Sequence, residues 1–210
     1  EILNIFQTQE KLVMQKCHNH ANLENIATLK DAGIKKIAIM TRDPRQVVVS
    51  WMNHLERHFG HAYLGKLRCD LPLDYESFIT TEKNDWIAKK YFLNFVEFAE
   101  SWWEVSQDER KKSNPDIEVY FSDHADLKRN GMSVVNSILR FFGFSKKVLT
   151  IEKKGGSVHG FRKASSNEFQ KVLSQEVQNW MWSEMQNSPK RRAVCNFFGW
   201  IENPDEIELK

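Results

Sequence analysis

The clearest feature of the hydrophobic pattern is a short, unbroken apolar run, Ile37-Ala-Ile-Met40. A run of this length is typical of a strand that is buried on both faces of a parallel sheet. A helix signal follows almost at once, because Asp43 can cap a helix and Pro44 suits its first position. The pattern therefore predicts a strand that leads directly into a helix.

The same pattern predicts helices and strands in alternation along the chain. Further strands are expected over 12–16 and 115–121, and helices over 22–32, 44–60, 85–105, 133–142 and 174–185. Residues 1–6 resemble the end of an amphipathic helix, 122–127 a turn, and 61–81 a long loop with a short helix capped by Asp74. This alternation predicts an α/β fold with a central parallel sheet flanked by helices.

Composition narrows the class of protein. The 210 residues are 41% hydrophobic and 28% charged, which is typical of one globular domain, and the net charge of +2 argues against a nucleic-acid or polybasic membrane surface. No apolar run approaches the roughly 20 residues of a membrane helix, so no transmembrane segment is expected. Three irregularly spaced cysteines (Cys17, Cys69 and Cys195) fit neither a disulfide framework nor a zinc site, and predict a reducing, cytoplasmic location.

The junction before Pro44 is a candidate anion site. Free backbone N–H groups and the positive end of the helix dipole would meet the guanidinium groups of Arg42 and Arg45 there. Ser50 lies two helical turns beyond Asp43, on nearly the same face. The alternative is a well-capped helix with two solvated arginines, and the physics alone does not choose between them.

A second candidate site is Lys16-Cys17-His18, at the end of the predicted strand 12–16. Residues two apart share a face there, and ligands of open α/β sheets bind beyond the carboxyl ends of the strands. A histidine can accept a proton from a hydroxyl near neutral pH, and a lysine can stabilise developing negative charge. The alternatives are a solvated surface pair, or His20 as the base in place of His18.

Three segments in order resemble sulfotransferases that use 3′-phosphoadenosine 5′-phosphosulfate (PAPS). Arg42 to Ser50 reads RDPRxVxxS, which is similar to the 3′-phosphate-binding segment of that family. Lys16 and His18 match its KxH catalytic strand, and the loop from Arg162 resembles its RKGxxGxW motif.

The resemblance implies a sulfuryl transfer that needs no metal, with PAPS as co-substrate and 3′-phosphoadenosine 5′-phosphate (PAP) as product. His18 would be the general base and Lys16 would stabilise the transferring group. Nucleotide contacts would come from six positions: Arg42, Ser50, Phe121, Arg162, Lys163 and Ala164. The acceptor would be a small molecule that presents a hydroxyl, or else an amine.

The sequence departs from the family pattern at several places. Ala164 and Asn167 replace glycines, and Phe169 replaces a tryptophan. Phe121 stands where the family has a tyrosine, so a hydroxyl contact is lost there. We therefore expect a nucleotide-binding loop that works but has a different shape, since an alanine can still donate its backbone N–H.

The family's P-loop-like segment has no counterpart in these 210 residues. The resemblance predicts a single domain over 1–210 with a three-layer, P-loop-type fold, whose first strand and phosphosulfate-binding loop would precede Glu1. Two other functions are compatible with the sequence: a P-loop kinase-like phosphotransferase, and a non-catalytic nucleotide-binding protein of the same fold.

Overall fold

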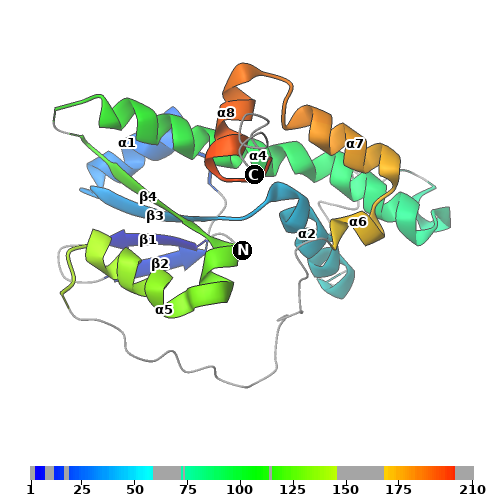
Figure 1. Ribbon diagram of the computed structural model, residues 1–210, viewed down its shortest axis with the longest axis horizontal. Helices are drawn as coiled ribbons and strands as arrows, with labels where there is room; N and C mark the ends of the chain where they lie inside the picture. The colour runs from blue at the N-terminus through cyan, green and yellow to red at the C-terminus, as the bar shows by residue number, and fades with distance from the viewer. Residues whose placement is uncertain are drawn as a thin grey trace, which may run out of the picture. The chain divides into compact units, whose positions relative to one another are not determined.

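The computed structural model of the protein describes residues 3–7, 12–16, 19–58, 72, 74–113, 115–145 and 168–201, the first two stretches through their backbone alone (Figure 1). The chain divides into two compact units: unit 1 comprises residues 1–42 and 97–162, and unit 2 comprises residues 43–96 and 163–210. The long helix α4 (Thr80–Arg110) contributes its first part to unit 2 and its second part to unit 1.

Unit 1 contains a four-stranded sheet in the order β2-β1-β3-β4. The strands are β1 (Leu3–Gln7), β2 (Leu12–Lys16), β3 (Lys36–Thr41) and β4 (Glu118–Asp123). β3 and β4 are parallel, as predicted, whereas β1 is antiparallel to both of its neighbours, so the sheet is mixed. The prediction of a helix end over residues 1–6 is wrong, because Leu3–Gln7 pairs with a strand on each side.

The strand directions bring three carboxyl ends to one edge of this sheet. Because β1 is antiparallel to both β2 and β3, β2 runs in the same direction as β3. Leu3 lies opposite Lys16 and Asn4 lies opposite Ile39, so the end of β2 is nearly level with the end of β3. In β4, Asp123 pairs with Thr41. We call the edge at Lys16, Thr41 and Asp123 the carboxyl edge.

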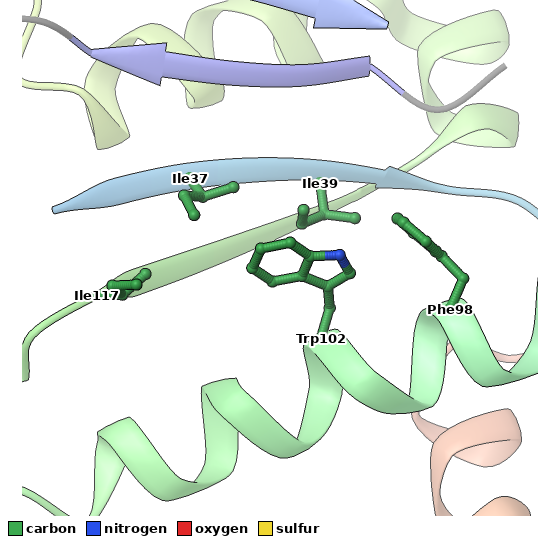
Figure 2. Packing of buried hydrophobic residues seen from close by; sticks show 5 residues of the cluster. All are labelled: Ile37, Ile39, Phe98, Trp102 and Ile117. Atoms are coloured by element: carbon green, nitrogen blue, oxygen red, sulfur yellow. The ribbon is translucent and has the colours of Figure 1, made fainter. Parts of the chain in front are cut away.

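Helices cover both faces of the sheet (Figure 1). On one face, Ile37 and Ile39 of β3 pack against Ile117 and against Phe98 and Trp102, which point from α4 toward the strand in Figure 2. Helix α1 (Leu23–Asp31) packs against the same cluster. On the other face, Ala38 packs against Ile138 and Phe142 at the end of α5 (His124–Phe141). The expectation of a strand buried on both faces is confirmed.

Most helix ends of unit 1 agree with the sequence signals. Asn22 caps α1 by accepting a 2.8 Å hydrogen bond from the Asn25 N–H, and Gly33 follows the helix with a φ of +71°. α5 begins at His124, so the predicted turn over 122–127 is wrong; the Asp123 side chain caps the helix. Asn130 has non-helical angles inside α5, and the helix predicted from residue 133 corresponds to the part of α5 that follows this kink.

Unit 2 is helical in its described part. It contains α2 (Pro44–His58), a short 3₁₀ turn (Tyr75–Ser77), the first part of α4, and α6 (Phe169–Val172), α7 (Gln175–Glu184) and α8 (Pro189–Phe197). α8 was not predicted from the sequence, although Ser188 caps it and proline occupies its first turn. Asp74 precedes the 3₁₀ turn without a side-chain capping bond, and most of the predicted 61–81 loop lies outside the described residues.

A cluster of charged residues lies at the end of α4, in unit 1. Glu109 of α4 is only 7% exposed, accepts a 2.7 Å hydrogen bond from Lys112 and accepts another, of 2.8 Å, from the backbone N–H of Asp116. Lys30 of α1 lies 3.8 Å from the same carboxylate. Burial raises the pKa of Glu109, but these hydrogen bonds and positive charges outweigh it, so its pKa lies below the ordinary value of 4.5.

We expect Glu109 to make the protein sensitive to acid. Because its pKa is lower in the folded state, the unfolded chain binds the proton first, and the free energy of unfolding decreases as the pH falls below about 4.5. Glu109→Gln should cost about 1–3 kcal/mol at pH 7, as a lost charge-assisted hydrogen bond does, and flatten this decrease. Denaturant titrations from pH 3 to 7 measure both effects.

The control is Glu97→Gln, which changes an exposed glutamate on the same helix. If the free energy of unfolding decreased equally steeply at low pH in Glu109→Gln and in the unchanged protein, the role given to Glu109 would be contradicted.

Candidate functional site

Polar residues gather where β3 and β4 end at the carboxyl edge. The hydroxyl of Thr41 donates a 3.3 Å hydrogen bond to the carbonyl of Ser122, which ties the two strand ends together. Arg42 follows β3 directly and is half-buried. Lys16 is the last residue of β2, so the backbone brings Lys16 and Arg42 to the same edge of the sheet.

Asp123 is a candidate that the sequence analysis missed. Its side chain accepts a hydrogen bond from the Ala125 N–H at the start of α5. Burial raises its pKa above the ordinary value of 3.8, although this hydrogen bond acts in the opposite direction. An aspartate between a strand and a helix was the available signal, but in sequence it resembles part of a turn.

The start of α2 differs from the predicted anion site. Pro44 has no N–H, the N–H of Arg45 donates to the Asp43 carboxylate at 2.9 Å, and the N–H of Gln46 donates to the Asp43 carbonyl at 2.9 Å. The N–H groups of Arg45 and Gln46 therefore already have acceptors, both of them on Asp43. The expectation of free backbone N–H groups at this helix end is wrong, because Asp43 already accepts from them.

The Arg45 side chain is also engaged within unit 2. Its guanidinium group pairs with the Asp43 carboxylate at 2.6 Å and donates a 2.6 Å hydrogen bond to the Trp200 carbonyl. Its central carbon lies 5.0 Å from the centre of the Phe169 ring. Arg45 therefore joins α2 to α6 and to the segment after α8.

His20, the competing base, has a packing role. Its ring meets Phe98 edge-on, with the ring centres 5.9 Å apart and an angle of 78° between planes. Its carbonyl accepts a 2.7 Å hydrogen bond from the Asn25 side chain. His20 is thus held against the buried cluster of unit 1 by ring and backbone together.

Comparison with known proteins identifies the family. The family model for the sulfotransferase domain matches residues 3–201. The chain belongs to the sulfotransferase family. Sulfuryl transfer is the general chemistry that this membership supports. Searches of curated proteins and of solved structures found no significant match.

The structure places only some of this sulfotransferase's predicted site residues. Lys16 is described through its backbone, and Arg42 with its side chain. Ser50 is half-buried on α2 and belongs to unit 2. The remaining members, except Phe121, lie outside the described residues: His18, Arg162, Lys163 and Ala164.

Phe121 of the sulfotransferase has a definite place in the core. It pairs with Ile39 across β3 and β4 and packs, half-buried, against the cluster that contains Trp102. This packing explains a phenylalanine at the position, and the predicted nucleotide contact of Phe121 stays a prediction.

No helix in the described part of the sulfotransferase is long and apolar enough to cross a membrane.

We expect Arg45 to matter for stability. Its side chain is 15% exposed, and a lysine cannot reproduce its forked contact with Asp43 together with the bond to the Trp200 carbonyl. Arg45→Lys should therefore lower the free energy of unfolding by about 1–3 kcal/mol in a urea titration. Arg129→Lys is the matched control, because Arg129 also pairs with an aspartate but is 76% exposed, and it should change nothing measurable. Equal stability of the two variants would contradict the role given to Arg45.

Proposed function

We propose that the protein transfers a sulfuryl group from PAPS to a hydroxyl, or an amine, of a small-molecule acceptor and releases PAP. The observation that supports this most is the combination of the family match with the carboxyl edge. Lys16 ends one strand of that edge, and Arg42 follows another. Ligands of open α/β sheets bind beyond this edge. We also propose that the sheet of unit 1, with helices on both faces, is part of a three-layer, P-loop-type fold.

In the proposed reaction, His18 accepts the proton of the acceptor hydroxyl. The acceptor oxygen forms a bond to sulfur while the bond between sulfur and the phosphate oxygen of PAPS breaks, in line with the attack. Lys16 stabilises the negative charge that shifts toward PAP. The packing of His20 against Phe98 supports His18 as the base, since the ring of His20 already has a structural contact.

The 3′-phosphate of the nucleotide would be held by charged and polar groups from distant parts of the sequence. These are Arg42, Ser50, Arg162 and Lys163, with the backbone N–H of Ala164. Because Arg45 is engaged with Asp43 and the Trp200 carbonyl, we assign the binding role at the end of β3 to Arg42. PAPS would supply the activated sulfuryl group.

One observation disfavours the kinase-like alternative. A kinase would need a carboxylate for a magnesium ion near the phosphates, and the carboxylate of Asp43, beside Arg42, already accepts from the backbone and the guanidinium group of Arg45. It is therefore committed to capping α2. A transfer assay with PAPS distinguishes the remaining alternative, a protein that binds the nucleotide without reacting.

His18→Ala should abolish sulfuryl transfer and leave nucleotide binding intact, because the base is removed and the phosphate contacts are not. Transfer of radiolabelled sulfate from PAPS and calorimetric titration with PAP measure the two properties separately. His20→Ala is the comparison variant and should retain transfer. Full activity of His18→Ala would overturn its assignment as the base.

Arg42→Ala should weaken PAP binding by about 1.5–3 kcal/mol, the scale of a lost charge-assisted hydrogen bond, which is at least about tenfold in the dissociation constant. Calorimetry with PAP measures it. Arg110→Ala removes an exposed arginine at the end of α4 and should not alter binding. Equal affinities of the two variants would exclude Arg42 from the nucleotide site.

A further inference from the structure

Two side chains of α4 contact the chain just beyond the end of β2. The indole N–H of Trp102 donates a 3.0 Å hydrogen bond to the carbonyl of Asn19. The hydroxyl of Ser101 accepts a 3.0 Å hydrogen bond from the N–H of Ala21. These partners are 83 and 80 residues apart in the sequence, so the contacts arise from the tertiary fold.

Both groups on α4 are themselves fixed. Trp102 is 1% exposed and is packed among Ile37, Ile39 and Phe98 (Figure 2). The Ser101 hydroxyl donates its hydrogen to the Phe98 carbonyl at 2.8 Å, which leaves its oxygen to accept from Ala21. Trp102, a rigid donor, and Ser101, a rigid acceptor, therefore hold the two ends of the three-residue segment 19–21.

The middle of the segment is held as well. The side chain of Asn25 donates a 2.7 Å hydrogen bond to the carbonyl of His20. Backbone groups of three successive residues, 19 to 21, are thus bound by side chains of Trp102, Asn25 and Ser101. No helix or strand includes these three residues, so the side chains supply the hydrogen bonds that a helix or a sheet would otherwise give to their backbone groups.

We propose that Ser101 and Trp102 are positioning residues for the general base, an inference that rests on the proposed function. His18 is joined to the anchored Asn19 by one peptide bond, and consecutive Cα atoms lie about 3.8 Å apart. On its other side the chain leaves the end of β2 at Lys16. The two anchors therefore fix the backbone next to the proposed base, and neither of them belongs to the proposed nucleotide contacts.

Removing one anchor should slow the chemical step and leave nucleotide binding alone. A displacement of about 1 Å at a reacting group can reduce a rate by up to about a hundredfold. We expect Trp102→Phe, which keeps most of the buried ring and loses the N–H, to lower kcat by about tenfold or more, with the KM for PAPS unchanged.

The chain supplies a matched control in the neighbouring residue. Trp103 lies on the same helix, and its buried indole N–H has no hydrogen-bond partner among the described residues. Trp103→Phe thus removes the same atoms without removing an anchor, and its kcat should stay within twofold of the unchanged protein.

The serine provides a second, independent pair of variants. Ser101→Ala removes the acceptor for Ala21 and should also lower kcat, whereas Ser101→Thr restores a hydroxyl and should recover most of it. Ser106→Ala is the control, because Ser106 makes the same type of bond to the carbonyl three residues earlier, Trp103, but forms no hydrogen bond with the segment 19–21. Should Trp102→Phe fail to fold, as judged by thermal melting, the serine variants decide.

The deciding experiment is steady-state kinetics of sulfuryl transfer from PAPS for these five variants on the full chain. A fall in kcat confined to Trp102→Phe and Ser101→Ala supports the inference. Equal kcat values for Trp102→Phe and Trp103→Phe, or no recovery in Ser101→Thr, would overturn it while the proposed function stands. Absence of transfer by the unchanged protein would instead overturn the proposed function, and the positioning role with it.

Discussion

The packing of Trp102 between α4 and β3 is the interaction on which unit 1 depends. The indole covers Ile37 and Ile39 from one side of the sheet and is almost completely buried. A buried aromatic side chain of this size contributes several kcal/mol of apolar burial. Its one polar atom also has a partner, the carbonyl of Asn19, so the same residue closes the core and holds the chain beyond β2.

The carboxyl edge follows from this arrangement. β3 is fixed by burial on both faces and β4 lies parallel to it. β1 is antiparallel to both β2 and β3, so β2 runs in the same direction as β3. Lys16, Thr41 and Asp123 consequently come from distant parts of the sequence to one edge. Arg42 has a proposed binding role because it lies at this edge. Arg45, only three residues later, instead donates a hydrogen bond within unit 2, to the Trp200 carbonyl.

The sequence predicted the elements whose signals are local. β3 was recognisable as an apolar run, and α1 by Asn22 at its start and Gly33 after its end. β1 was not, because its residues also fit the end of an amphipathic helix and its identity comes from the strands on both sides. The start of α5 was missed because a capping aspartate and a turn aspartate look alike in sequence.

The roles of the candidate site residues stay predictions. The family motifs indicated Lys16, His18, Arg42 and Ser50 from short strings. The engagement of Arg45 was not predictable, because its partner, the Trp200 carbonyl, is 155 residues away. The anchors at Ser101 and Trp102 were equally hidden, since the aromatic positions of α4 indicated packing and nothing about the segment beyond β2.

The proposed function requires that the chain beyond β2 and the chain beyond β3 contact a single bound nucleotide. Titration of the ¹⁵N-labelled protein with PAP, followed by backbone amide NMR, tests this most directly. If the proposed function is right, the amide signals of Lys16, His18 and Arg42 shift together along one saturable binding curve. Shifts confined to one of the two strand ends, or the absence of saturable shifts at both, would contradict it.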